Sequence, residues 1–270
     1  MDKPLRIAEE TYVLPFTFPV PGLGLLQVNP MVIRAEQPVL VDTGPPVFRE
    51  QYLEAAFSLV DPKAVRWVFL SHDDRDHSGN LMQVLDLCPN ARLATTFIGV
   101  GRMGEEWQLP LPRVVLVNDG ESFDAGDRTL TAIRPPLFDA PGTRGLWDST
   151  TGVYYSVDSF GAFIPAQCEQ MADVPEDAYQ RGFAIFNRIN HPWHEVSDGD
   201  RLAAQVDRVR RLDARAIVSY HGPTAHHRSA QLCDALVATA AMEPMPLPTQ
   251  ADLEAMLAAG GHAAEPAAVG

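Results

Sequence analysis

Residues 71–79 read Ser-His-Asp-Asp-Arg-Asp-His-Ser-Gly and follow the apolar run 65–70, Val-Arg-Trp-Val-Phe-Leu, which is typical of a buried strand. Two histidines and three aspartates lie close together here. Neutral imidazole binds divalent first-row metals, and carboxylates suit harder ions. A loop after a strand can aim several such side chains at one point. The stretch therefore indicates a metal site, with a charged surface turn as the alternative.

Composition limits the classes of partner. The chain has 270 residues, 46% of them hydrophobic, which is enough for one large domain. Its formal charge is −14, from 21 basic and 35 acidic residues. Nucleic-acid binding usually requires a basic surface, so we expect no nucleic-acid partner.

The termini and cysteines suggest a cytoplasmic protein. The N-terminus lacks the apolar segment of a signal peptide, and no stretch approaches the ~20 apolar residues of a spanning helix. We therefore expect no membrane partner. Cys88, Cys168 and Cys233 are widely spaced and form no CxxC pair, which predicts buried free thiols rather than disulfides or a thiolate zinc site.

Hydrophobic periodicity predicts an α/β chain. Strands are expected at residues 11–18, 25–34, 38–41, 65–70, 92–95, 113–117, 128–134, 152–157 and 216–219. Helices are expected at residues 47–60, 80–87, 98–107, 167–190, 198–212, 227–242 and 251–259. We expect the strand at 128–134 to pair with that at 152–157. The order predicts two sheets in a sandwich with helices outside, as one domain over residues 1–245. Residues 246–270 are expected to form a C-terminal helix and a disordered tail.

Candidate ligands recur at the ends of predicted strands. The residues at 72–77 follow one strand, Asp158 ends a second and His221 ends a third. Loops at one edge of a sandwich converge, so residues that are distant in sequence can meet there.

At these residues the chain resembles the metallo-β-lactamase fold, whose ligand loop reads His-x-His-x-Asp-His and whose Asp-Thr-Gly lies upstream, here at 42–44. It is most similar to the di-iron branch, which comprises flavodiiron proteins and oxygen-binding di-iron proteins. That branch has a carboxylate at the second ligand position, as Asp74 is here. Residues 77–80, 157–162 and 221–223 also resemble it. The resemblance covers about residues 10–240 and implies an αββα four-layer sandwich of two mixed β-sheets with helices on the outside.

The resemblance also implies a set of metal ligands. One metal would be held by His72 and Asp74, and a second by Asp76 and His221, with His77 adjacent. Asp158 matches the bridging carboxylate, and we assign catalytic roles to Asp76 and Asp158. The predicted ligands are His72, Asp74, Asp76, His77, Asp139, Asp158 and His221.

Asp139 departs from the family pattern. The family has a histidine in a Leu-His-x-Pro loop, whereas residues 138–141 here read Phe-Asp-Ala-Pro. The interval from Asp139 to Asp158 fits, so we predict that Asp139 is a ligand. The alternatives are a weakened first site, or a ligand supplied by His191 or His194. These two histidines could also gate the site or form a surface turn.

Other residues are expected to support the site. Asp42 would orient a ligand imidazole, with a turn-closing Asx motif as the alternative. Tyr155, Trp147, Trp193 and Tyr220 are candidates to line the pocket, with core packing as the alternative reading.

Four carboxylates and three histidines form a hard, anionic ligand set. Such a set favours two iron ions, with manganese or zinc as alternatives. Summed carboxylate charge would stabilise Fe(III) and lower the reduction potential.

Three functions are consistent with these residues. The first is a di-iron protein that binds or reduces O2 or NO, as an oxygen sensor or as a reductase. Flavodiiron enzymes carry a flavodoxin domain after this fold, and residues 222–270 are too few for one, so a separate redox partner is expected. The second is a metal-dependent hydrolase of an ester, thioester, lactone or phosphodiester, with Asp76 as a base. The third is a non-catalytic module with a damaged site. A homodimer is compatible with each.

Overall fold

The structure is a computed structural model that describes residues 3–243 and 245–258. The predicted disordered tail, residues 260–270, lies outside the described residues. The helices are α1 (Arg49–Leu59), α2 (Arg75–Ser78), α3 (Leu81–Leu87), α4 (Phe97–Met103), α5 (Glu176–Ile189), α6 (Gly199–Arg210), α7 (Ser229–Thr239) and α8 (Gln250–Ala258). Short 3-10 turns lie at Pro46–Phe48, Leu111–Arg113, Met171–Asp173 and Pro192–Val196.

A seven-stranded sheet forms one inner layer. In spatial order it contains β1 (Leu5–Ala8), β2 (Thr11–Val13), β5 (Met31–Ile33), β6 (Val39–Val41), β7 (Trp67–Phe69), β8 (Arg92–Thr95) and β9 (Val114–Leu116). The strands from β6 to β9 run parallel, whereas those before β6 pair antiparallel. This sheet is therefore mixed.

A six-stranded sheet forms the other inner layer. It contains β10 (Ser122–Asp124), β11 (Thr129–Ile133), β12 (Gly145–Asp148), β13 (Val153–Val157), β14 (Ala216–Ser219) and β15 (Ala225–His226). Only β13 and β14 pair in parallel. A separate hairpin consists of β3 (Phe16–Val20) and β4 (Gly24–Val28).

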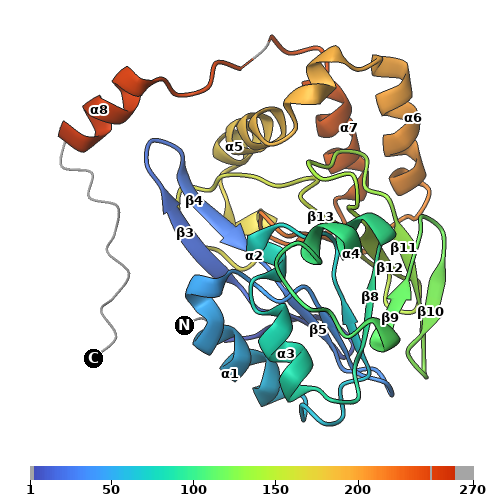
Figure 1. The fold of residues 1–270 in the computed structure, drawn as a ribbon. Helices are drawn as coiled ribbons and strands as arrows, with labels where there is room; N and C mark the ends of the chain where they lie inside the picture. The colour runs from blue at the N-terminus through green and yellow to red at the C-terminus, as the bar shows by residue number, and fades with distance from the viewer. Residues whose placement is uncertain (1–2, 244, 259–270) are drawn as a thin grey trace.

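The two sheets lie between helices in the order that the resemblance predicts. Helices α1 and α3 lie on one side of the sheets, and α5, α6 and α7 lie on the other (Figure 1). All residues of β6 and β7 are buried. Parallel strands that are covered on both faces read as continuous apolar runs, which is why these two strands are recognisable in the sequence.

The predicted pairing of the strands at 128–134 and 152–157 is wrong. Strand β12 lies between them and pairs antiparallel with both β11 and β13. It is only four residues long, Gly-Leu-Trp-Asp, and lacks β-branched residues. Its placement comes from its two neighbours rather than from its own strand propensity, so the sequence resembled a loop there.

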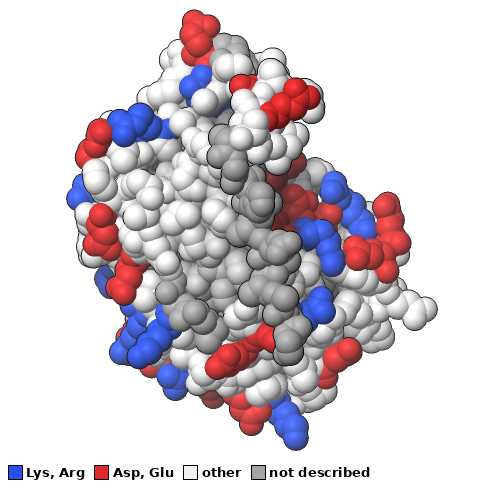
Figure 2. All heavy atoms as spheres, turned by 90° about the vertical axis from the view of Figure 1, so that its left-hand side faces the viewer, with Lys and Arg blue, Asp and Glu red and all other residues white. Residues whose placement is uncertain are grey.

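The surface is uneven in charge. Figure 2 shows an area of one face without Lys, Arg, Asp or Glu, with both acidic and basic side chains around its margins. Among the described residues, no helix is long and apolar enough to cross a membrane. The boundary near residue 245 stays a prediction; α8 lies beyond it, as expected.

Candidate metal centre

Strand ends bring the candidate ligands together. In the first sheet, β6 leads to Asp42 and the neighbouring parallel strand β7 leads to His72. In the second sheet, the parallel pair β13 and β14 leads to Asp158 and His221. Carboxyl ends of adjacent parallel strands meet at one edge, and here the edges of both sheets meet.

Two of these strand ends have unusual backbone conformations. Asp42 has φ +55° and Val157, directly before Asp158, has φ +57°. A β-branched residue in the left-handed region is a rare and strained conformation, and such residues cluster at functional sites. At Val157 the chain leaves the strand sharply, which turns Asp158 toward the opposite sheet.

The predicted loop at 71–79 is partly helical. Residues 75–78 form the short helix α2, which carries Asp76 and His77. Both side chains are therefore fixed by a helical turn, and His77 is 1% exposed.

The first group of donor atoms surrounds His72. The Nε2 atom of His72 lies 3.6 Å from Oδ2 of Asp74, 3.6 Å from Oδ1 of Asp139 and 3.8 Å from Oδ2 of Asp158. These separations are too long for hydrogen bonds. They suit atoms that share one metal ion, because each metal–ligand bond is about 2.0–2.2 Å long.

The second group surrounds His77 and His221. Oδ2 of Asp76 lies 3.2 Å from Nε2 of His221 and 3.6 Å from Nε2 of His77. Oδ1 of Asp158 lies 3.2 Å from Nε2 of His77 and 3.4 Å from Nε2 of His221. All seven predicted side chains therefore lie within two adjoining groups. That they bind metal stays a prediction.

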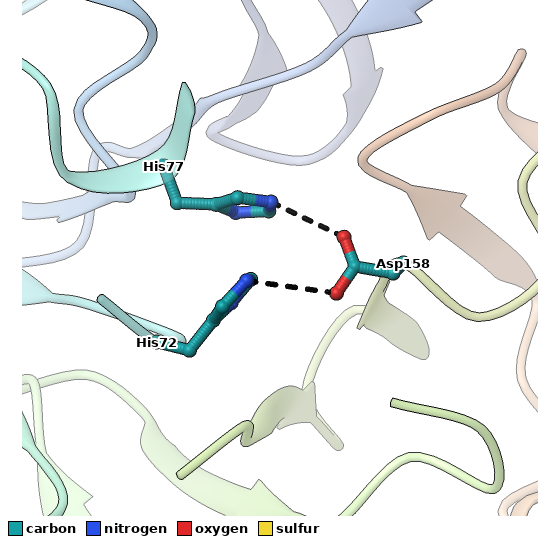
Figure 3. A group of neighbouring side chains, drawn as sticks. All are labelled: His72, His77 and Asp158. Carbon is teal, nitrogen blue, oxygen red and sulfur yellow. Dashed lines mark hydrogen bonds and ion pairs between the residues drawn. The ribbon is translucent and has the colours of Figure 1, made fainter. Parts of the chain in front are cut away.

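Asp158 faces both groups. Its Oδ2 atom points at His72 and its Oδ1 atom at His77, as Figure 3 shows. Asp158 is 1% exposed, and within the described part of the chain neither its Oδ2 nor Nε2 of His72 has a hydrogen-bond partner. Buried polar atoms without partners cost free energy. A pair of metal ions bridged by this carboxylate would satisfy both atoms, so the residues present fit such a pair.

Asp42 lies behind the ring of His77 and is hydrogen-bonded to it. Its Oδ2 atom accepts a 2.7 Å hydrogen bond from Nδ1 of His77, which leaves Nε2 facing the centre. The hydroxyl of Tyr155 also donates to this carboxylate. Ser71 donates to it twice, from its backbone N–H and from its hydroxyl, each at 2.7 Å. Buried Asp42 is thus fully hydrogen-bonded and fixes the tautomer of His77.

The charges of the site shift the titration of its members. Burial lowers the pKa of His221, but Asp158 and Asp76 outweigh it and raise the pKa to about 9. Burial raises the pKa of Asp139 to about 6, with a further contribution from Asp158. Burial also opposes ionisation of Asp158, yet His72 and His77 hold its pKa well below the usual range. At neutral pH, metal-free protein therefore carries on the His221 ring a proton that a metal ion would have to displace.

The family follows from the comparison with known proteins. A family profile described as ODP family beta lactamase matches residues 26–222, most of the chain. The chain belongs to this family. The recognition of the metallo-β-lactamase fold and its di-iron branch from the sequence is confirmed.

Individual relatives of the family are flavoproteins and oxidoreductases. Diflavin flavoprotein A 1 of Synechocystis is 24% identical over 209 residues, which are 76% of this chain and 35% of the relative. The chain thus spans about a third of the length of this relative and of two putative diflavin flavoproteins of Nostoc.

Solved structures of the family share the fold. Rubredoxin oxygen:oxidoreductase from Desulfovibrio gigas has a TM-score of 0.74 at 19% identity and covers 90% of this chain, which covers 63% of that one. The flavodiiron protein from Giardia intestinalis has a TM-score of 0.75 at 17% identity. The match covers 88% of this chain and 59% of the Giardia protein. The αββα sandwich is confirmed by both.

Several residues of this ODP-family site were missed by the sequence analysis. Tyr220 was expected only as a pocket candidate, yet its ring stacks on His77 at 3.8 Å and its hydroxyl donates to the backbone carbonyl of Asp76. No role was predicted for Ser71, which donates two hydrogen bonds to Asp42. Its position directly before His72, at the end of a strand, could have indicated such a role. Directly after α5, Asn190 donates a 3.3 Å hydrogen bond to Oδ2 of Asp139.

Other candidates lie outside the two groups. His191 is buried, with Nδ1 3.3 Å from the carbonyl of Asn187, and is no member of either group. The side chain of His194 lies outside the described residues. Trp193 supports the loop of Asp139, since its Nε1 donates a 2.8 Å hydrogen bond to the carbonyl of Phe138.

Two charged residues between the candidate ligands, Asp73 and Arg75, form ion pairs away from the donor groups. Asp73 pairs with Arg102 of α4, and Arg75 lies 3.4 Å from Glu106 and over the ring of Trp107. These residues form the outer wall of the site.

Proposed function

We propose that this chain is a non-haem di-iron protein that binds or reduces O2 or NO. The supporting observation is that Asp158 directs one carboxylate oxygen at each of two groups of imidazole and carboxylate donors. One iron would be held by His72, Asp74 and Asp139, and the other by Asp76, His77 and His221, with Asp158 shared. When bound, two ferrous ions would supply electrons to a diatomic ligand between them.

The protein's own residues keep this centre rigid and shielded. Asp42 holds the ring of His77 from behind, and Tyr220 covers its face. Phe186 lies 5.3 Å from the ring of His221, measured between centroids. His72, His77 and Asp158 are each no more than 1% exposed. This packing restricts the access of bulk water to the donor atoms.

A small ligand could reach the two donor groups from the side of α4. A cavity of about 430 Å³ is lined by residues 73–76 and by residues 102, 103, 106 and 107. Of the proposed ligands, Asp74 and Asp76 line this cavity, and their side chains are 38% and 34% exposed. We assign Asp76 and Asp158 the catalytic positions because both lie against the histidines, Asp76 at the cavity and Asp158 between the two groups.

A separate redox protein would supply the electrons for reduction. One relative is named rubredoxin oxygen:oxidoreductase, and others are named diflavin flavoproteins. This chain matches only about a third of the length of the diflavin relatives. The source of its electrons is therefore proposed here and is not taken from those relatives. Without such a donor, the same centre would act as an oxygen binder or sensor.

The proposal is tested by metal content and gas consumption. Protein reconstituted anaerobically with Fe(II) should hold two irons per chain and develop a ferric charge-transfer absorption in air. With a chemical reductant, it should consume O2 or NO in proportion to its iron content. A preference for two zinc ions, with turnover of a thioester or phosphodiester and no gas consumption, would overturn it in favour of a hydrolase.

A further inference from the structure

The two donor groups are chemically unequal. The first offers one imidazole, from His72, and two carboxylates, from Asp74 and Asp139. The second offers two imidazoles and a single carboxylate. Because Asp158 presents one oxygen to each group, it adds nearly the same charge to both. The first group therefore carries one more formal negative charge in direct contact with its ion.

The surroundings reduce this difference without removing it. Beside the first group, a guanidinium nitrogen of Arg102 lies 4.0 Å from Asp74, but its side chain is 50% exposed and water screens its charge. Behind the second group, the Asp42 carboxylate contacts His77. It is separated from the ion by the whole imidazole ring, and three donor residues share its charge. Coulomb energy falls with distance, so the directly bound carboxylate has the larger effect.

We propose that the two irons differ in reduction potential and that the ion held by His72, Asp74 and Asp139 is the harder to reduce. This inference rests on the di-iron centre of the proposed function. Anionic oxygen donors stabilise Fe(III) over Fe(II), whereas imidazole suits the softer ferrous ion. With two ferric ions bound, the first electron from a reductant such as dithionite would go to the ion held by Asp76, His77 and His221. The ion held by His72, Asp74 and Asp139 would accept the second electron.

Asp139 is the residue on which this difference depends. It comes from the loop between β11 and β12 and is anchored by Asn190 and by the turn that Trp193 holds. Replacement by histidine would give both groups two imidazoles and one carboxylate, with the bridge unchanged. Asp139→His is therefore expected to bring the two potentials together by raising the lower one.

The test uses the full chain loaded with two irons and titrated with dithionite under argon. Potentiometric titration followed by electron paramagnetic resonance should show two resolved one-electron steps, with a mixed-valence signal between them. In Asp139→His the steps should merge and the maximum of that signal should fall. His227→Gln, which changes an exposed histidine outside both groups, should titrate like the wild type.

Crystals reduced by one electron locate the ferric ion directly. Anomalous diffraction measured across the iron absorption edge reports the oxidation state at each position, and Fe(III) is expected beside Asp139. Fe(III) beside His221, or equal states at both positions, would overturn the inference even if the protein holds two irons and consumes O2. Absence of iron binding would overturn the proposed function and the inference together. If Asp139→His does not fold, the wild-type crystals still decide.

Discussion

His77 and Asp42 are joined by a 2.7 Å hydrogen bond between Nδ1 and Oδ2, and this bond fixes which nitrogen of His77 faces the metal centre. Removal of the anionic acceptor should therefore weaken metal binding without deleting a ligand. We expect Asp42→Asn to lower metal affinity about 10–100-fold, the usual effect of losing such a partner. Competition with a chromophoric chelator measures this. Asp86→Asn makes the same charge change at an exposed residue of α3 outside both groups and should leave the affinity near wild type.

Asp158 should be required for both metals because each of its oxygens faces a different group. Asp158→Ala is expected to remove both ions, as measured by elemental analysis of protein whose circular dichroism remains native. A variant that keeps both ions at full occupancy would exclude the bridging role. Loss of only one ion would also contradict it.

Two adjacent buried tyrosines offer a matched comparison of stability. The hydroxyl of Tyr155 donates to the Asp42 carboxylate, whereas that of Tyr154 has no hydrogen-bond partner among the described residues. Tyr155→Phe should lower the free energy of unfolding by about 1.5–3 kcal/mol, as expected for a bond to a charged group. Tyr154→Phe should cost close to nothing. Urea unfolding of both variants measures the contrast, and equal losses would argue against a special role for the Asp42 network.

Metal-free protein should lose stability at alkaline pH. The pKa of His221 in the folded state is about 9, above the ordinary value near 6.5, because Asp158 and Asp76 outweigh the effect of burial. The stabilisation by the protonated ring is complete below the ordinary pKa and disappears as pH rises through about 9. Metal affinity should increase over the same range, because metal and proton compete for Nε2.

The matching variant is His221→Gln. It should flatten the alkaline slope of stability in metal-free protein, measured by thermal unfolding at a series of pH values. An unchanged slope would assign the effect to another group.

Asp139 should destabilise the metal-free protein at neutral pH. Burial and the charge of Asp158 raise its pKa to about 6, so the ionised form is disfavoured in the folded state. The stability associated with its protonated form is present below the unfolded pKa near 4 and lost as pH rises through about 6. Asp139→Asn should therefore raise the melting temperature of metal-free protein at pH 7.5. The gain should vanish at pH 4; a gain of the same size at both pH values would contradict the electrostatic cause.

The sequence by itself determined the family, the layer order and the identity of the candidate ligands. Apolar runs such as β6 and β7 are recognisable because both faces of these strands are buried, and each ends directly before Asp42 or the His72 loop. Most of the candidate ligands belong to short local motifs, and the spacing of residues within a motif can be read directly from the sequence.

Only the tertiary structure showed that Asp139 joins His72 and Asp74, and which contacts hold the two groups in place. The pairing of β12 depends on two neighbouring strands, and the contacts of Tyr220 and Asn190 join segments that are far apart in sequence. The same is true of Asp158, whose two oxygens face different groups only because the edges of two sheets meet. Such contacts arise from packing between distant elements, and no local pattern of residues encodes them.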